Sequence, residues 1–171
     1  MLTRRTFAGV LLLILFVVIG LLGLSVWQIL FTYETIDASE GTQIERVLVP
    51  EFKASTSELA SFAALRNWAQ GSWTHYCVLD YSTTEPVVER YGQANGLRLG
   101  SVKLDSIFFA RPGVWSIILM SEGRYKQVVM PSHQIALMPD IIGRCARIDE
   151  AILQLDMPPG DPFISLSKPR P

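Results

Sequence analysis

The sequence predicts an α+β protein in which a single transmembrane helix precedes a mostly antiparallel sheet covered by one or two helices. An unbroken apolar run opens the chain, alternating segments separated by compact turns occupy its middle, and two amphipathic segments carry helix-capping residues. The predicted parts are a cytoplasmic N-terminus (1–6), a transmembrane helix (7–31), a tether (32–53), a periplasmic α+β domain (54–156) and a proline-rich tail (157–171).

The apolar opening has the length of a membrane span. Every residue from Phe7 to Leu24 is apolar or glycine, and Trp27, Phe31 and Tyr33 follow as an aromatic belt. About 25 residues make a helix of roughly 37 Å, which crosses a hydrocarbon core of about 30 Å. A removable signal peptide has an apolar core of only ~7–15 residues. We therefore expect a retained anchor.

Two arginines set the expected orientation of this helix. Arg4 and Arg5 are the charged residues that precede it, and positive charge stays on the cytoplasmic side. The remaining chain then lies in the periplasm of a bacterial-type inner membrane. Residues 3–7 also resemble a twin-arginine export signal, although Ala8 and Gly9 stand where that signal usually has a leucine and a lysine.

The composition of the rest excludes one class of partner. Residues 32–171 hold all sixteen acidic residues and thirteen of the fifteen Lys and Arg residues, an excess of three negative charges. No basic field attracts nucleic acid. Cys77 and Cys145 both lie in this part, and in an oxidising compartment they are expected to form a disulfide. Two buried free thiols are the alternative.

The first half of the domain predicts two helices and a strand. Ser55 and Glu58 have capping-box spacing, and an apolar stripe continues to about Gln70, with Gly71 as the stop. Residues 73–81 alternate as a strand, which would place Trp73, His75 and Cys77 on one face. A second helix is expected from Thr83 or Thr84 to the Asn95-Gly96 exit, and a further strand after it suggests a crossover.

The second half predicts antiparallel strands. Residues 102–131 contain three apolar stretches separated by "RPG" and "SEG", which indicates a meander. Residues 132–143 are ambiguous, and residues 145–156 fit a strand or a short amphipathic helix, of which we favour the strand. From residue 157 on, the absence of a packing pattern predicts a disordered tail or an extended segment lying on a partner.

Candidate metal ligands are few. His75 and Cys77 share one face of the predicted strand, a geometry that binds copper or zinc, and His133 with Met130 and Met138 would complete a site. Cys145 competes for Cys77, and methionines among apolar residues are usually core filler. No cofactor is expected.

Catalytic patterns are weak as well. His75 with Asp80, or His133 with Asp140, would supply a base and its orienting carboxylate, but the sequence has no nucleophile elbow, phosphate loop or dinucleotide fingerprint. We therefore expect a non-catalytic protein.

Binding remains as the leading hypothesis. Trp68, Trp73 and Trp115 are candidate partner-binding residues, because tryptophan is enriched in binding hot spots, although at least two of them are expected in the core. The sequence favours a membrane-anchored accessory protein that binds another envelope protein. The alternatives are a periplasmic immunity protein that neutralises a toxin, a copper or zinc carrier, and a small periplasmic enzyme.

Overall fold

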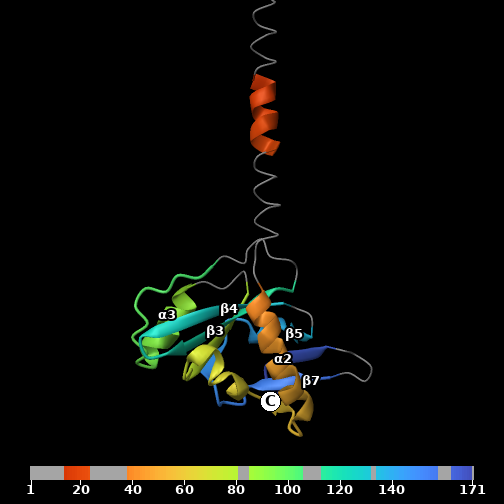
Figure 1. The fold of residues 1–171 in the computed structure, drawn as a ribbon, viewed down its shortest axis with the longest axis vertical. Helices are drawn as coiled ribbons and strands as arrows, with labels where there is room; N and C mark the ends of the chain where they lie inside the picture. The colour runs from red at the N-terminus through yellow and green to blue at the C-terminus, as the bar shows by residue number, and fades with distance from the viewer. Residues whose placement is uncertain are drawn as a thin grey trace, which may run out of the picture. The chain divides into compact units, whose positions relative to one another are not determined.

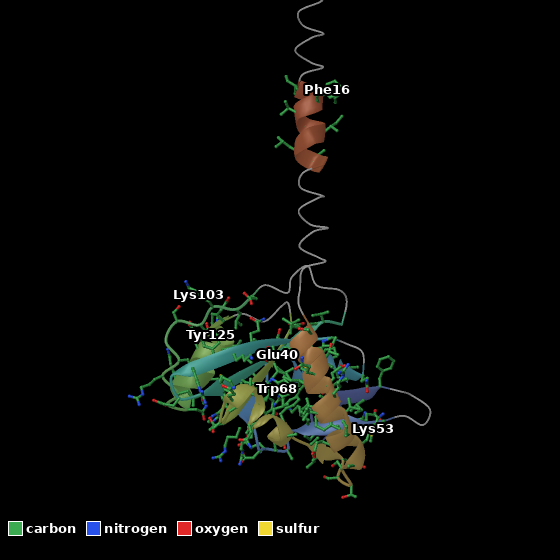
Figure 2. The ribbon with its side chains drawn as sticks, viewed as in Figure 1. Phe16, Glu40, Lys53, Trp68, Lys103 and Tyr125 are labelled. Atoms are coloured by element: carbon green, nitrogen blue, oxygen red, sulfur yellow. A yellow bond between two sulfur atoms is a disulfide. The ribbon has the colours of Figure 1, made fainter. Side chains whose placement is uncertain are left out.

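The computed structural model describes residues 14–23, 38–80, 85–105, 113–131, 134–157 and 163–170. It divides into two compact units, Met1–Ile36 and Asp37–Pro171. In the first unit, residues 14–23 form a helix whose large apolar side chains are exposed, with Phe16 at 69% (Figure 2). The rest of the predicted 7–31 span lies outside the described residues.

Among the helices of the described residues, none is both long and apolar enough to cross a membrane.

The second unit is α+β, as predicted, but its described residues form two four-stranded sheets rather than one (Figure 1). The first sheet has the order β4-β3-β2-β6 and is antiparallel throughout; its strands are Arg124–Met130, Trp115–Ser121, His75–Leu79 and Cys145–Arg147. The second sheet has the order β1-β7-β8-β5, in which only β5 and β8 run parallel; its strands are Leu59–Ala60, Leu153–Asp156, Ile164–Ser167 and Ile135–Leu137.

A helix replaces most of the predicted tether. α2 spans Ser39–Ala54 and buries one stripe of residues: Gly41, Ile44, Glu45, Leu48, Val49 and Phe52. The sequence pattern did not predict this helix for two reasons. A charged residue, Glu45, interrupts the apolar stripe, and Pro50, which lacks an N–H, lies inside the helix. α2 contacts β4, the edge of the first sheet, and its Glu45 side chain reaches the start of β5 in the second sheet.

The helix predicted over residues 55–70 is wrong. Ser55 is the C-cap of α2, and the segment continues as β1 and two 3-10 turns, η1 (Ala63–Leu65) and η2 (Trp68–Gln70). Glu58 accepts a hydrogen bond of 2.7 Å from the Leu155 amide of β7. The backbone of this segment is therefore used for sheet pairing, and its apolar residues reach the core without a helix.

β2 is buried on both faces rather than one. Tyr76 and Val78 belong to the main core, which also includes the apolar stripe of α2 and residues of both sheets. Cys77 and Leu79 belong to a smaller cluster under α3. Trp73, predicted on the face of Cys77, lies instead in the main core.

The second predicted helix is confirmed as α3, Glu85–Ala94, whereas Thr83 and Thr84 lie outside the described residues. Its end is a Schellman motif, in which the Leu97 amide donates to the Gly92 carbonyl at 2.9 Å and Gly96 has φ +70°. The expected crossover is wrong, because β2 and β3 are antiparallel neighbours.

The β3–β4 hairpin confirms part of the predicted meander. Ser121 pairs with Arg124 across a two-residue turn, and Gly123 has φ +68°. The preceding segment is not a strand over residues 102–105, and residues 106–112 lie outside the described part. The Lys103 amide donates a hydrogen bond of 2.8 Å to the Tyr125 hydroxyl (Figure 2). Residues 102–105 therefore contact β4 through side chains of that strand and not through a backbone ladder.

The C-terminal region is more ordered than predicted. Residues 145–156 form two strands, β6 and β7, which belong to different sheets. The predicted tail contains β8, whose Ile164 and Leu166 side chains are buried in the main core. In a strand of four residues flanked by prolines, the alternation of apolar and polar residues is too short to recognise. β8 is ordered by pairing with its neighbours β7 and β5.

Candidate functional site

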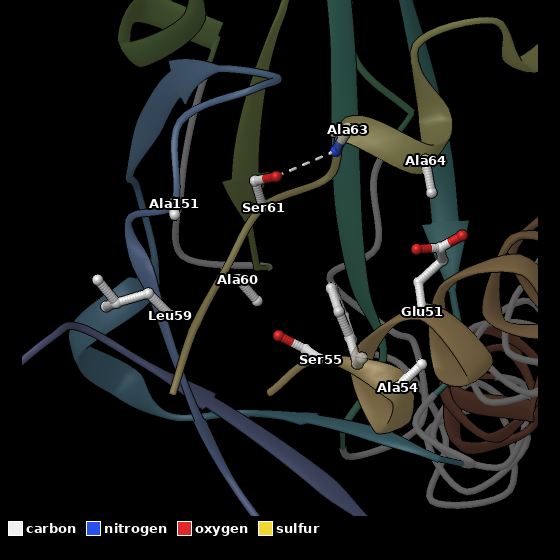
Figure 3. A pocket seen from close by; sticks show the side chains of 10 residues that line it. Glu51, Ala54, Ser55, Leu59, Ala60, Ser61, Ala63, Ala64 and Ala151 are labelled. Atoms are coloured by element: carbon white, nitrogen blue, oxygen red, sulfur yellow. Dashed lines mark hydrogen bonds between the residues drawn. The ribbon is translucent and has the colours of Figure 1, made fainter. Parts of the chain in front are cut away.

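An open groove of about 300 Å³ lies between the end of α2 and β1. This volume is at the lower end of the range for small-molecule pockets, which starts near 300 Å³. We call it the β1 groove, and it is lined by Glu51, Phe52, Ala54, Ser55, Leu59, Ala60, Ser61, Ala63, Ala64 and Ala151. In Figure 3, Glu51, Ala54 and Ser55 lie across the groove from the β1 segment, and Ala151 lies on the other side of that segment.

One wall of the groove is the unpaired edge of a sheet. β1 is the end strand of the second sheet in the described part of the chain, and its Leu59 faces Gln154 of β7. Hydrogen-bonded and non-hydrogen-bonded pairs alternate along an antiparallel ladder. Because the neighbouring pair Glu58 and Leu155 is hydrogen-bonded, Leu59 and Gln154 form a non-hydrogen-bonded pair. The N–H and C=O of Leu59 therefore point away from β7.

Local hydroxyl groups satisfy part of this edge. The Leu59 amide donates to the Ser57 Oγ atom at 3.1 Å, and the Ala63 amide donates to the Ser61 Oγ atom at 3.4 Å. Among the described residues, neither the Leu59 carbonyl nor the Ser61 amide has a hydrogen-bond partner. The Leu59 carbonyl and the Ser61 amide are therefore an acceptor and a donor, two residues apart, that this edge offers to an added strand.

Small side chains shape the groove. Seven of its ten lining residues are alanine or serine, and Glu51 is the ionisable residue among them. Most of these small residues lie in residues 54–65, "ASTSELASFAAL". In the sequence, the same alanine-rich composition favours a helix. Sequence analysis missed the groove because it depends on where β1 pairs.

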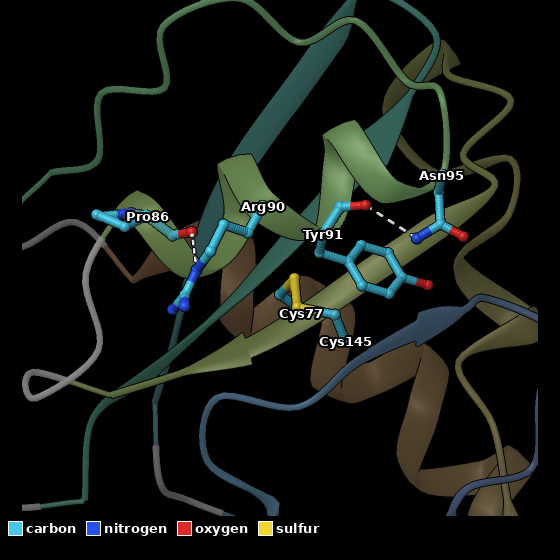
Figure 4. The surroundings of a disulfide bond; sticks show 6 residues. All are labelled: Cys77, Pro86, Arg90, Tyr91, Asn95 and Cys145. Atoms are coloured by element: carbon cyan, nitrogen blue, oxygen red, sulfur yellow. Dashed lines mark hydrogen bonds between the residues drawn. A yellow bond between two sulfur atoms is a disulfide. The ribbon is translucent and has the colours of Figure 1, made fainter.

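The expected disulfide is present. Cys77 and Cys145 face each other across β2 and β6 and are bonded (Figure 4). Tyr91 of α3 packs against the same cluster, so the bond is covered from the outside of the first sheet. β6 lies in the segment predicted as one element over residues 145–156, and β7 and β8 follow it.

His75 lies next to the disulfide at the start of β2. Its Nδ1 atom is 2.8 Å from the Thr74 Oγ atom, and its ring meets Tyr91 edge-on with centroids 5.8 Å apart. Burial lowers the pKa of His75, and the positive charge of Arg147, its partner on β6, lowers it further. Burial also raises the pKa of Tyr91 to about 12, and the Glu150 carboxylate adds to that shift.

The described residues do not bring the candidate metal ligands together. The Cys77 sulfur is bonded to Cys145, which removes the proposed thiolate, and His133 lies outside the described residues. Met130 is buried in the main core, whereas Met138 is exposed. In the described part of the chain, no three His, Cys, Asp or Glu residues form a group that could hold a metal ion.

One candidate catalytic pair is separated, and one member of the other lies outside the described residues. His75 begins β2 and Asp80 follows its end, so five strand steps of about 3.3 Å place them roughly 16 Å apart. Asp140 lies in η3, Pro139–Ile141, where its Oδ2 atom accepts from the Lys168 amide at 3.0 Å. His133, its expected partner, is not among the described residues.

Two of the three candidate tryptophans are core residues. Trp73 and Trp115 are 5% and 2% exposed, as expected for at least two of the set. Trp68 is half-buried and donates through Nε1 to the Glu40 carboxylate at 3.2 Å (Figure 2). Lys126 of β4 forms an ion pair with the same carboxylate, so Glu40 joins the start of α2 to both η2 and β4.

The residues expected to orient and flank the membrane helix all lie outside the described residues: Arg4, Arg5, Trp27, Phe31 and Tyr33.

The described residues define an α+β domain of two sheets that is cross-linked by a disulfide and has a groove at the β1 edge of its second sheet. No protein-family model, curated protein or solved structure matches the chain.

Proposed function

We propose that the protein is a singly anchored membrane protein whose Asp37–Pro171 unit lies outside the cytoplasm and binds another envelope protein as an accessory subunit. The observation that carries the binding role is the β1 groove, a concave surface with an unpaired sheet edge as one wall. Edges of this kind accept extended segments of other proteins.

Three features support this location. The Cys77–Cys145 disulfide is typical of proteins that fold in oxidising compartments such as the periplasm. The helix over residues 14–23 exposes apolar side chains on all sides, with Leu22 at 61%, which suits a lipid environment. Arg4 and Arg5 precede the apolar run and favour a cytoplasmic N-terminus.

Topology tests the location directly. An alkaline phosphatase fused after Pro171 is expected to be active, and a fluorescent protein that matures only in the cytoplasm is expected to stay dark. The mature chain is expected to begin at or near Met1. A mature N-terminus close to Val26, or an active cytoplasmic reporter, contradicts the anchored arrangement.

Cross-linking in intact cells tests the binding role. A photoreactive residue replaces Ala64, which lines the groove, and in a matched variant it replaces Ala94, an exposed alanine of α3. We expect a discrete cross-linked protein from position 64 and none from position 94. If exposed positions on both sheets and both helices all yield uncross-linked chain, the accessory role is wrong.

A further inference from the structure

The unpaired edge of β1 carries backbone hydrogen-bonding groups that fit a parallel added strand. In a parallel pairing, one residue of the added strand donates its N–H to a carbonyl and accepts from the amide two residues further along. The Leu59 carbonyl and the Ser61 amide form such a pair, centred on Ala60, and neither has a partner in the described part of the chain.

An antiparallel pair centred on Leu59 fits this edge less well than the parallel pair centred on Ala60. It would need both the N–H and the C=O of Leu59 for one residue of the partner. The Leu59 amide already donates to the Ser57 hydroxyl at 3.1 Å, so an antiparallel partner would have to displace that bond. The Ser57 hydroxyl therefore competes with an antiparallel pair centred on Leu59, whereas the parallel pair centred on Ala60 meets no such competitor among the described residues.

The walls of the groove limit the side chains of the occupant. Alternate side chains of a strand added beside β1 would point into a space bounded by Ala54, Ala63 and Ala64. The total volume is about 300 Å³, part of which the added backbone itself fills. Alanine, glycine or serine is the size of side chain that this space admits.

Charge sets a further preference. Glu51 is exposed and is the ionisable side chain among the described residues that line the groove. A lysine or arginine next to the small residues of the occupant would lie near this carboxylate, whereas an acidic residue there would be repelled. The groove is therefore complementary to a neutral or basic segment.

We propose that the β1 groove binds an extended segment of the partner protein as a parallel added strand, with small side chains in the groove and a basic residue beside Glu51. This inference rests on the proposed function, because it assigns the contact by which the accessory subunit holds its partner. The segment is recognised through its backbone by Leu59 and Ser61 and through its side-chain size by the alanine walls.

A defined peptide tests the proposal with the full chain in mild detergent. The probe is a capped peptide, Thr-Ala-Val-Ala-Thr-Lys, titrated while the backbone amides of the protein are followed by NMR. We expect the largest shifts at residues 59–64, with the Ser61 amide moving as it gains a hydrogen bond. Replacing the central amides of the peptide by esters is expected to weaken binding roughly fivefold to tenfold, as loss of one hydrogen bond does.

Two variants of the protein make the test specific to the groove. Ala64→Phe fills the groove from an exposed position and is expected to abolish the shifts, while Ala94→Phe on α3 is the matched control and is expected to leave them unchanged. Exchanging the lysine of the peptide for glutamate is expected to weaken binding, and Glu51→Gln is expected to remove that preference.

Several results would overturn the inference. The proposal is wrong if millimolar peptide causes no shifts at residues 59–64, if the ester peptides bind as tightly as the amide, or if Ala64→Phe binds like the unchanged protein. A Ser61 amide already protected from hydrogen exchange in the free chain would show that a segment of this chain fills the groove. Loss of the position-64 cross-link alone overturns the groove, whereas loss of every cross-link overturns the proposed function.

Discussion

Gly41 of α2 lies directly against the main chain of Val129 in β4. A Cβ atom at position 41 would overlap the Val129 carbonyl oxygen and would lie 2.9 Å from the Cα atom of Met130. This contact brings the first turn of α2 onto the edge of the first sheet, and Glu40, the preceding residue, forms an ion pair with Lys126 of the same strand. The start of α2 is therefore positioned by backbone contact with β4.

Gly41→Ala is expected to destabilise the protein by about 1–3 kcal/mol, because the obstacle is backbone that cannot move aside as a side chain would. The free energy of unfolding in urea measures the effect. Gln43→Ala, at an exposed position of the same helix, is the matched control and is expected to change stability very little. Equal stability of the two variants would contradict the close approach.

Glu45 joins α2 to the start of β5. Its side chain is 2% exposed, and its Oε1 atom accepts from the amides of Gln134 and Ile135 at 3.3 and 3.4 Å. Glu45→Ala leaves both amides without this acceptor and is expected to cost about 1–3 kcal/mol in the free energy of unfolding. Glu45→Gln keeps an acceptor oxygen and is expected to cost less.

Hydrogen exchange at the Ile135 amide separates this role from simple packing. We expect faster exchange in Glu45→Ala than in Glu45→Gln, because only the alanine variant removes the acceptor. The contact carries no such role if exchange at Ile135 is unchanged in both variants.

The disulfide closes a loop with a sequence separation of 68. The chain-entropy model gives a stabilisation of about 4 kcal/mol for a loop of this length. Reduction is therefore expected to move the unfolding midpoint to a markedly lower denaturant concentration. The double variant Cys77→Ala with Cys145→Ala is the control, since a reductant should not alter its midpoint. Identical midpoints for the oxidised and reduced protein would show that the bond does not stabilise the fold.

Acidification is expected to destabilise the fold through His75. Its pKa in the folded state is below the usual value, so near pH 6.5 the folded state binds fewer protons than the unfolded state. The stabilisation is complete above about pH 6.5 and is lost as the pH falls through the lower pKa of the folded state. Urea midpoints measured between about pH 7.5 and about pH 5 should fall more steeply for the natural protein than for His75→Gln.

Arg147 gives a second variant for the same prediction. Arg147→Gln removes a positive charge that lowers the pKa of His75, so the pH dependence should become shallower without vanishing, because burial of the ring is the larger cause. A slope in His75→Gln as steep as in the natural protein would assign the pH dependence to other groups.

Short-range patterns in the sequence were sufficient for α3 and for the β3–β4 hairpin. Asn95-Gly96 ends α3 because glycine adopts the positive φ that a Schellman motif needs, and the turn between Ser121 and Arg124 likewise contains Gly123. Each signal lies within a few residues of the structure that it specifies. The pairing of Cys77 with Cys145 was also predicted, since the chain has only these two cysteines.

Only the tertiary structure decided α2, β1, β8 and the groove. Glu45 belongs in the buried stripe of α2 because two amides, 89 and 90 residues away, donate hydrogen bonds to its carboxylate, and no local pattern reveals that. β1 and β8 are strands of two and four residues that exist through pairing with β7. The sequence by itself determined the local elements and the class of fold, whereas contacts between distant segments determined which short segments became strands and which sheet edge stayed open.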